Sequence, residues 1–320
     1  MSIPKFEYLL SAVKKVREIN QLKCDSGRDV SVVVLDRGLG DAIVCEPIFR
    51  YLAPKEGNKM VCLVREAHAP VCTMFPAVDL VIPIKDEWEF LFMAALSNTK
   101  NWYFPDFRCR KWGRWGYKKL FLPQSFTSET PYNYANFQDK GTLLEVYSEM
   151  GGLPRLNMRP ILDITRGHFS KLVLPQRPFL TVQTASGNPL RTWDPQKWRQ
   201  LVRDFPSVTF VEIGTKPLLC NLPNCNSSLC GKLSVADIAY VIDQSSGFIG
   251  TDSSCAHYAS ALRKKSLIIM TKYYHWSNYN PFSGIDDDPS FYLAYFSREM
   301  KDVTVEEVAE YFKNHYTEIL

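Results

Sequence analysis

Four polar side chains follow a short apolar run in the C-terminal half of the sequence, and together they suit the binding of an anion. The apolar run is Gly247–Gly250, and the polar residues are Thr251, Asp252, Ser253 and Ser254. All four residue types have side chains suited to a helix N-cap, and small apolar residues at helical spacing follow them. A strand that leads into a helix in this way offers free backbone N–H groups and the positive end of the helix dipole. The pattern therefore favours a phosphate or diphosphate site, with an ordinary capped helix as the alternative.

A second pattern of strand, glycines and helix stands near the start of the chain. The β-branched run at 32–34 is typical of a buried parallel strand. Gly38 and Gly40 then predict a tight turn, and Asp41 stands where a helix begins. Two such patterns on one chain predict an α/β protein with two doubly wound, Rossmann-like parallel-sheet domains that face each other across a cleft.

Between the two patterns lies a polar loop that ends in a basic residue. The apolar run at 179–183 predicts a buried strand, and Thr184 and Ser186 belong to the loop that follows it. Open α/β sheets bind ligands at this end of their strands. Arg191 comes next, and its guanidinium can hold a phosphate with two parallel hydrogen bonds; a surface salt bridge is the alternative. Gly214 ends the next predicted strand.

Three motifs in this order resemble those of the ADP-heptose:lipopolysaccharide heptosyltransferases, glycosyltransferase family 9. The first is Arg37–Asp41, followed by a proline and a leucine in the next helix. The second is Arg191–Trp198, which holds a basic residue, a Trp–Asp–Pro element and a second tryptophan. The third is Ile249–Ser253, with His257 in the helix after it. The resemblance covers roughly residues 30–275.

The resemblance implies a GT-B fold and the transfer of a sugar from a nucleoside-diphosphate sugar to a hydroxyl group. It gives Asp41 the role of the base that takes the proton of the acceptor hydroxyl; a helix N-cap carboxylate is the alternative. Direct attack by the activated hydroxyl inverts the anomeric centre. The donor is a heptose-like nucleotide sugar, and the acceptor is a surface saccharide or glycolipid such as lipopolysaccharide.

The donor site follows from the second and third motifs. Arg191 and the backbone N–H groups near Ser253 and Ser254 stabilise the leaving diphosphate, and Asp252 holds hydroxyls of the sugar. His257 either contacts a phosphate or packs in the interior. Because the arginine and the helix dipole carry the positive charge, we expect no metal or other cofactor. The predicted donor-binding residues are Thr184, Ser186, Arg191, Gly214, Thr251, Asp252, Ser253, Ser254 and His257.

The stretch Lys100–Lys119 holds seven basic residues, seven aromatic residues and a single acidic residue. Aromatic rings stack on sugars or bases, and basic side chains meet phosphates. We interpret the stretch as an acceptor-binding wall; a strand and loop with aromatic residues packed inward is the alternative. Its charge also suits a DNA backbone, which keeps a second acceptor open, the hydroxymethylated bases of phage DNA. The wall residues that we single out are Arg108, Arg110, Lys111, Trp112, Arg114 and Trp115.

The motif at Tyr273–Tyr279 departs from the family, because aromatic residues replace a short glycine-containing loop. The departure leaves the donor sugar and its base open. It also leaves open a third function, a nucleotide-sugar-binding protein without catalysis, although the presence of Asp41 argues against it. Cys220, Cys225 and Cys230 recur at a spacing of five, which is poor for zinc.

Length and composition agree with a two-domain protein. The chain has 320 residues, of which 46% are hydrophobic, and a formal net charge of +4. We expect an N-terminal acceptor domain at 1–170 and a C-terminal donor domain at 171–320, whose last helix returns to the first domain. No segment reaches the ~18 apolar residues of a membrane span, and no export signal is visible. These features predict a cytoplasmic protein without an obligatory protein partner, or one in the host cytoplasm if a phage encodes it.

The segment 4–23 has apolar residues along one side and basic residues on the other. This pattern predicts an amphipathic helix that packs on the first domain. A helix at the inner face of a membrane is the alternative.

Overall fold

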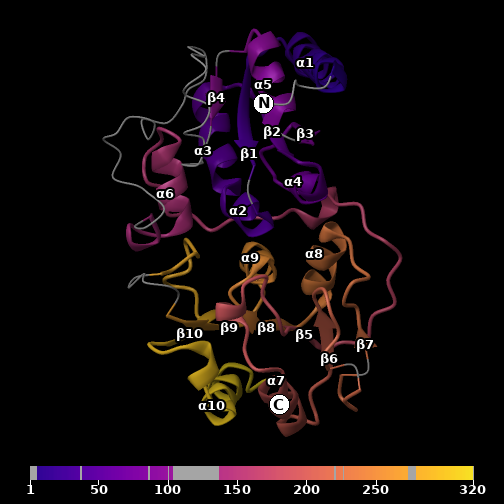
Figure 1. Cartoon of the computed structure of the whole chain (residues 1–320), viewed down its shortest axis with the longest axis vertical. Helices are drawn as coiled ribbons and strands as arrows, with labels where there is room; N and C mark the ends of the chain where they lie inside the picture. Colours follow the sequence, from indigo (N-terminus) through magenta and orange to yellow (C-terminus); the bar gives the residue numbers. More distant parts are fainter. Residues whose placement is uncertain are drawn as a thin grey trace. The chain divides into compact units, whose positions relative to one another are not determined.

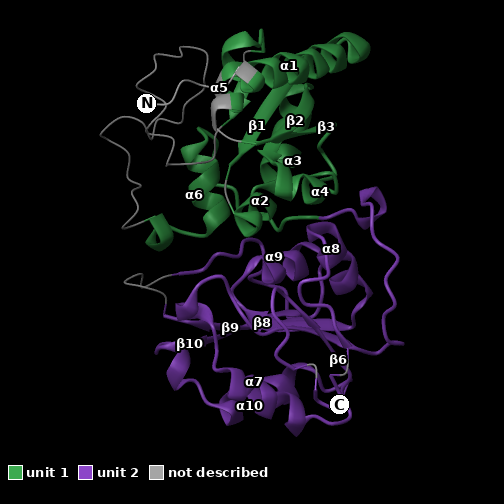
Figure 2. Ribbon diagram, turned by 45° about the vertical axis from the view of Figure 1, so that its right-hand side comes forward, with its two compact units in different colours: residues 1–161 green, residues 162–320 purple. Residues whose placement is uncertain are grey.

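The computed structural model describes residues 6–36, 38–85, 87–99, 101–103, 137–219, 221–225, 227–272 and 279–319. The chain divides into two compact units, Met1–Ile161 and Leu162–Leu320 (Figure 2). Each unit has its own sheet of parallel strands joined by helices (Figure 1). The predicted α/β class with two parallel-sheet domains is confirmed. The cleft between the domains stays a prediction.

The described strands of the N-terminal unit form a parallel sheet in the order β3-β2-β1-β4. Strand β1 is buried at every position, as expected for a run of valines with helices on both sides. The strands are β1 (Val30–Leu35), β2 (Lys59–Arg65), β3 (Leu80–Ile84) and β4 (Asn101–Tyr103). The helices are α1 (Phe6–Ser26), α2 (Leu39–Val44), α3 (Glu46–Glu56), α4 (Ala69–Cys72), α5 (Glu87–Leu96) and α6 (Leu143–Met150), with 3-10 turns at Glu66–His68 and Phe137–Asp139.

The amphipathic N-terminal segment forms α1 and packs against α5 in the core of this unit. Ala12, Val16 and Ile19 are buried at helical spacing, whereas Leu10 is 56% exposed. The structure thus confirms a packing helix, and the membrane-surface interpretation stays a prediction. No helix among the described residues is long and apolar enough to cross a membrane.

A buried ion pair joins α1 to α5. The Lys15 Nζ atom lies 2.5 Å from Glu89 Oε1, and Glu89 is fully buried. Burial by itself raises the pKa of Glu89. Hydrogen bonds from Lys15, from the Ser11 hydroxyl and from the backbone N–H of Lys85 outweigh burial, so the pKa is lowered overall. The carboxylate is therefore ionised at neutral pH and ties α1 to α5.

Replacing Glu89 by glutamine should lower the free energy of unfolding of the N-terminal unit by roughly 1.5–3 kcal/mol at pH 7, because charged hydrogen bonds are lost. The pKa of Glu89 is lower in the folded state than in the unfolded state. Its contribution to the free energy of unfolding is therefore present above the ordinary glutamate pKa and is lost as the pH falls through the folded-state pKa. The difference between variant and wild type should therefore shrink toward pH 3. Urea unfolding at both pH values measures the difference, and Asp29→Asn, in an exposed ion pair with Lys23 of the same unit, is the control with little effect. A gap that is equally large at pH 3 would contradict the assignment.

The described strands of the C-terminal unit form a parallel sheet in the order β10-β9-β8-β5-β6-β7. The strands are β5 (Leu180–Gln183), β6 (Phe210–Ile213), β7 (Ser227–Ser228), β8 (Gly247–Thr251), β9 (Ser266–Thr271) and β10 (Phe291–Phe296). The helices are α7 (Pro195–Asp204), α8 (Val235–Gln244), α9 (Ser254–Ala261) and α10 (Val305–His315), with 3-10 turns at Ile164–Arg166, Pro189–Arg191 and Met300–Asp302.

The core of this unit contains both tryptophans of the second sequence motif. Trp193 and Trp198 are fully buried and meet edge to face, with ring centroids 5.1 Å apart. The indole N–H of Trp193 donates to the carbonyl of Val303 at 2.9 Å. Phe312 and Tyr316, from the end of the chain, lie in the same core. The last helix therefore packs on its own unit, and its return to the first domain stays a prediction.

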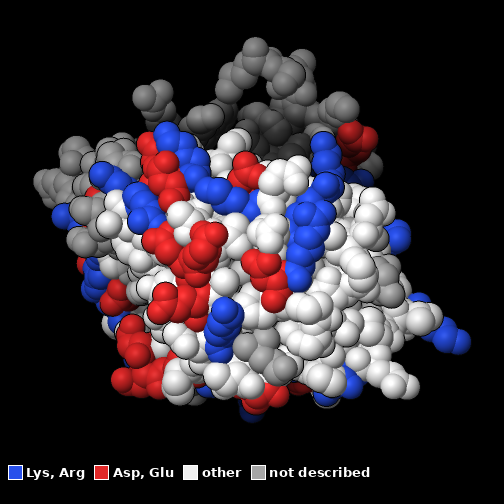
Figure 3. All heavy atoms as spheres, turned by 90° about the horizontal axis from the view of Figure 1, so that it is seen from below, with Lys and Arg blue, Asp and Glu red and all other residues white. Residues whose placement is uncertain are grey.

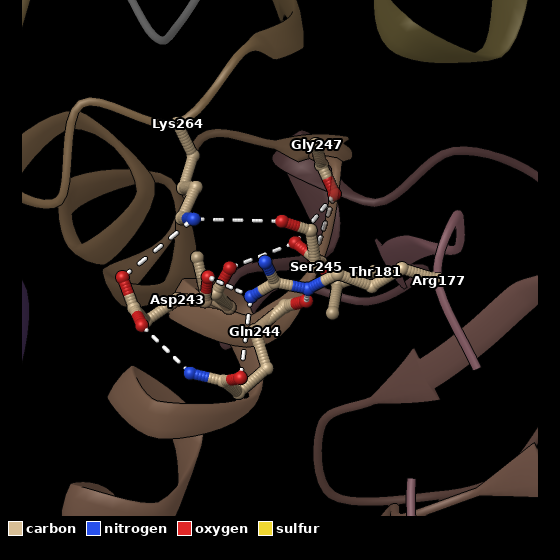
Figure 4. A network of polar contacts seen from close by, with 8 residues as sticks. Arg177, Thr181, Asp243, Gln244, Ser245, Gly247 and Lys264 are labelled. Carbon is tan, nitrogen blue, oxygen red and sulfur yellow. Dashed lines mark hydrogen bonds and ion pairs between the residues drawn. The ribbon is translucent and has the colours of Figure 1, made fainter. Parts of the chain in front are cut away.

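Two basic residues cap the C-terminal end of α8, at the edge of the sheet where β8 begins (Figure 4). Arg177 donates to the backbone carbonyls of Gln244 and Asp243, and Lys264 Nζ lies 3.4 Å from the Ser245 carbonyl. The last carbonyls of a helix lack intrahelical partners and carry its negative dipole end. The cations therefore fix the connection from α8 into β8.

Candidate functional site

The strand order places both predicted motifs at comparable positions in their sheets. In the C-terminal unit β5 pairs with β6 on one side and with β8 on the other. In the second pair Gln183 lies opposite Gly250. In the N-terminal unit β1 lies between β2 and β4 in the same way. Such a point, where the strand order reverses, opens a crevice at the carboxyl ends of the strands. Asp41 and the residues after Gly250 both follow such ends.

The strand β8 approaches β5 so closely that Gly250 has no room for a side chain. A Cβ atom at this position would lie 2.8 Å from the ring of Phe248 and 3.1 Å from the carbonyl oxygen of Gln183. Ser253 is the N-cap residue of α9, but its hydroxyl donates to the Gln183 side-chain oxygen at 2.9 Å instead of capping the helix. The first turn of α9, which begins at Ser254, therefore presents backbone N–H groups that this side chain does not satisfy.

The structure brings Arg191 and Asp252 together. Arg191 Nη1 lies 2.6 Å from Asp252 Oδ2, and the Tyr279 hydroxyl donates to the same oxygen. The side chain of Asp252 is only 4% exposed and that of Arg191 is 25% exposed. The salt-bridge interpretation of Arg191 is thus realised, although the pair is mostly buried and not at the surface. Whether the two residues also bind a donor stays a prediction.

Two buried polar atoms at the end of β8 have no hydrogen-bond partner among the described residues. They are Asp252 Oδ1 and Thr251 Oγ1. Leaving a buried acceptor unsatisfied costs about 1–3 kcal/mol, and more for a charged group. Native proteins keep few such atoms, and those that persist call for an explanation such as a missing water or ligand. These two atoms can accept hydrogen bonds from ligand hydroxyls.

Thr184, one of the predicted donor-binding residues, lies beside the carboxylate of Glu212, which the sequence analysis did not single out. Glu212 is fully buried on β6 and accepts the backbone N–H groups of Leu218 and Leu219 at 2.7 and 3.1 Å. Thr184 Oγ1 lies 3.4 Å from the same carboxylate. Gly214 has a φ of +133°, which only glycine adopts without strain. Glu212 therefore supports the loop after β6, and the signal for it was a glutamate inside an apolar strand.

Ser186 has a local role in the loop after β5. Its hydroxyl accepts the backbone N–H of Asn188 at 3.3 Å, and its own N–H lies 3.3 Å from Thr192 Oγ1. These bonds shape the turn at Pro189–Arg191 and so place the arginine.

His257 lies in the interior of the C-terminal unit. It is 5% exposed, and its ring centroid lies 4.7 Å from that of Phe282. The packing interpretation is thus observed, and contact with a phosphate stays a prediction. Burial raises the pKa of the neighbouring Cys255 thiol to about 12, so this thiol is protonated at neutral pH. Cys225 and Cys230 are buried; Cys220 lies outside the described residues.

In the N-terminal unit the helix after β1 begins earlier than predicted. Because α2 starts at Leu39, Gly40 lies within its first turn and not in a turn before it. The N-cap is Gly38, so Asp41 is not a capping carboxylate, which corrects the alternative for this residue. Asp41 instead accepts a hydrogen bond at Oδ1 from the hydroxyl of Tyr147, 2.6 Å away.

A histidine and an ion pair accompany Asp41 at the carboxyl ends of β1 and β2. Arg65 Nε lies 2.7 Å from Asp36 Oδ1. Burial and then the charge of Arg65 lower the pKa of His68, against the opposing charges of Asp41 and Asp36. His68 is therefore a neutral imidazole at pH 7. Sequence reasoning missed it, although its position just after β2 was a usable signal.

Several predicted residues lie outside the described part of the chain. They are Arg37 of the first motif, the loop at 273–278, and the predicted acceptor wall with Arg108, Arg110, Lys111, Trp112, Arg114 and Trp115.

Comparison with protein families supports the sequence resemblance. Residues 212–276 match the sequence model of glycosyltransferase family 9 (heptosyltransferase). This segment begins at Glu212 and contains the strand β8, Asp252 and the helix α9. The resemblance to the family is thus confirmed over the segment that holds the predicted donor-binding residues from Gly214 to His257, whereas Thr184, Ser186 and Arg191 lie before it. A search of curated proteins finds no match.

Solved structures share the fold over nearly the whole chain. Escherichia coli ADP-heptose LPS heptosyltransferase II has a TM-score of 0.66 and 13% identity, with 91% of this chain and 99% of that chain covered. E. coli heptosyltransferase WaaC with ADP has a TM-score of 0.67 and 13% identity, with coverages of 89% and 99%. A family 9 glycosyltransferase from Veillonella parvula has a TM-score of 0.65 and 14% identity, with 91% of this chain and 98% of that chain covered. At this identity the likeness establishes the GT-B fold.

Replacing Arg191 by methionine should destabilise the C-terminal unit by about 3 kcal/mol, because it leaves the buried Asp252 carboxylate without its cation. Arg191→Lys keeps the charge and should cost less. Denaturant unfolding measures both variants. Arg298→Met is the matched control, since the ion pair of Arg298 with Glu307 is exposed and should contribute under about 1 kcal/mol. Equal stability of Arg191→Met and wild type would show that the pair does not form in solution.

Proposed function

We propose that the protein is an inverting glycosyltransferase that moves a sugar from a nucleoside-diphosphate sugar to a hydroxyl group of a saccharide acceptor. One observation carries this proposal. The segment that matches family 9 contains β8 and α9, and its Asp252, just before that helix, forms a mostly buried ion pair with Arg191 from the loop after β5. A helix N-terminus next to a guanidinium is suited to a diphosphate.

The donor binds with its diphosphate toward the first turn of α9 and toward Arg191. A guanidinium has five N–H donors in a planar fork, so an ion pair through Nη1 is compatible with phosphate contact. The sugar hydroxyls donate to Asp252 Oδ1 and Thr251 Oγ1, the two buried acceptors at the end of β8. The compared WaaC structure has ADP in its name, and a second E. coli WaaC structure has ADP-2-deoxy-2-fluoro heptose. These names support an ADP-linked heptose as the first donor to test.

Asp41 acts as the general base. It takes the proton of the acceptor hydroxyl while the oxygen attacks the anomeric carbon, and the bond from that carbon to the diphosphate oxygen breaks. The electron pair of this bond leaves with the diphosphate, whose charge Arg191 and the α9 dipole stabilise. In-line attack inverts the anomeric configuration. No metal or other cofactor is part of the proposed mechanism, because these groups supply the positive charge.

The proposed acceptor is a lipopolysaccharide-type or other surface saccharide, reached from the cytoplasm, with peripheral membrane association through α1. Modified DNA bases are the competing acceptor. On the face shown in Figure 3, basic and acidic side chains lie side by side among the described residues. A nucleic-acid backbone binds surfaces that are positive throughout, so the mixed charges on this one face of the C-terminal unit offer DNA no binding surface there.

A nucleotide panel tests the donor site. ADP or ADP-heptose at about a hundredfold excess over Kd should raise Tm by roughly 5 °C or more, because only the folded state binds it. The Asp41→Asn variant is the control and should keep this shift, since Asp41 belongs to the other unit. Stabilisation by UDP but not by ADP would overturn the proposal that the donor carries adenine. No stabilisation by any nucleotide would contradict the proposed function.

Turnover tests the base. Asp41→Asn should lower kcat by roughly 10²–10⁴ with donor binding retained, because an amide cannot take the proton. Nucleoside-diphosphate release measures kcat, with a lipopolysaccharide core saccharide and hydroxymethylated duplex DNA as parallel acceptors. Full activity of Asp41→Asn would remove Asp41 as base. If the wild type binds the nucleotide sugar but transfers no sugar to either acceptor, a non-catalytic nucleotide-sugar-binding protein is favoured.

A further inference from the structure

A buried tyrosine that no sequence motif singled out contacts the proposed base. Tyr147 on α6 is 1% exposed, and its hydroxyl donates to Asp41 Oδ1 at 2.6 Å. The two residues are 106 positions apart in the sequence, so only the packing of α6 beside α2 brings them together.

Helix α6 is fixed at both ends, so the phenol has a defined position. Thr142 and Glu145 form a capping box at its start, each side chain bonded to the backbone N–H of the other residue. Near its end the Ser148 hydroxyl accepts the backbone N–H of Leu156 at 2.9 Å. A donor on such an element is pre-organised and does not have to be ordered during the reaction.

The second oxygen of Asp41 lies against a glycine. A Cβ atom at Gly38 would stand 3.0 Å from Asp41 Oδ2, closer than side chains normally approach. The carboxylate is therefore held by a donor at Oδ1 and given room at Oδ2 by the missing side chain of Gly38. A rotation about the Cβ–Cγ bond of Asp41 that falls short of a half-turn would break the hydrogen bond to the phenol, whereas a half-turn exchanges two equivalent oxygens and restores it.

We infer that Tyr147 is a positioning residue for the proposed base: it occupies Asp41 Oδ1 and thereby leaves Oδ2 to take the proton of the acceptor hydroxyl. The inference rests on the proposed function of Asp41. A general base must lie within hydrogen-bond reach of the proton that it takes, and small misplacements cost rate steeply. Tyr147 acts through Asp41 and need not touch either substrate.

The first test is Tyr147→Phe, which removes the hydroxyl and keeps the ring. With ADP-heptose and the core saccharide, kcat should fall about 10- to 100-fold, whereas the KM values for both substrates stay within about twofold. Tyr316→Phe is the matched control, because it also removes a buried hydroxyl, bonded 2.6 Å from the Phe248 carbonyl, in the core of the other unit. The control should lower Tm without lowering kcat. A wild-type kcat in Tyr147→Phe would overturn the inference.

A double variant separates positioning from a general loss of structure. Asp41→Glu moves the carboxylate away from the phenol, so adding Tyr147→Phe to it should change kcat by less than about twofold. An undiminished 10- to 100-fold loss in the Asp41→Glu background would show that Tyr147 acts by another route. Full activity of Asp41→Asn would end the base assignment itself, whereas an inactive Asp41→Asn beside a fully active Tyr147→Phe would end only the role of the tyrosine.

A spectroscopic test does not depend on turnover. Protein labelled with 13C at the aspartate carboxyl carbons should show one resonance that disappears in Asp41→Asn and changes its position in Tyr147→Phe at constant pH. In Tyr316→Phe that resonance should stay unchanged. If Tyr147→Phe also leaves it in place, the phenol does not contact the carboxylate in solution and the inference is overturned.

Discussion

The pairing of β5 with β8 is the contact on which the C-terminal unit depends. It puts Gln183 opposite Gly250, and the missing side chain of Gly250 lets the strands close on each other. As a result, the loop after β5 and the loop after β8 emerge side by side at the carboxyl edge of the sheet. Arg191 reaches Asp252 from one loop to the other across that edge. The ion pair is therefore a consequence of the strand order.

In the C-terminal unit, two buried acceptors lie at the carboxyl edge of the sheet without a partner among the described residues. They are Thr251 Oγ1 and Asp252 Oδ1 at the end of β8, and other such atoms, for example Trp198 Nε1, lie elsewhere in the unit. A buried polar atom without a partner calls for an explanation, and at the end of a strand beside a switch point a ligand supplies one. In the N-terminal unit the Asp41 carboxylate, which follows β1, is instead bonded to a buried phenol.

Much of the fold could be predicted, because its signals are local. The valine run of β1 and the small residues after β8 set strand and helix by themselves, and the spacing of the motifs placed Asp41 and Asp252 at strand ends. Contacts between distant residues could not be predicted in this way. Tyr147 is an ordinary core position in a helical pattern, and only the packing of α6 turns it toward Asp41. The pair of glycines predicts a turn that includes Gly40, whereas the helix already starts at Leu39.

The cations at the end of α8 have a consequence for how this protein can change. Arg177 and Lys264 secure the amino edge of the sheet in the C-terminal unit, whereas the candidate donor residues stand at the carboxyl edge. Both cations thus add stability at the end of the strands opposite to the candidate donor residues, whereas the pair of Arg191 and Asp252 stabilises the carboxyl edge itself. Natural or laboratory selection can therefore exchange other loop residues at the carboxyl edge while this pair and the amino edge keep the unit folded. Under the proposed function, those loop residues are the ones to vary in a redesign of donor preference.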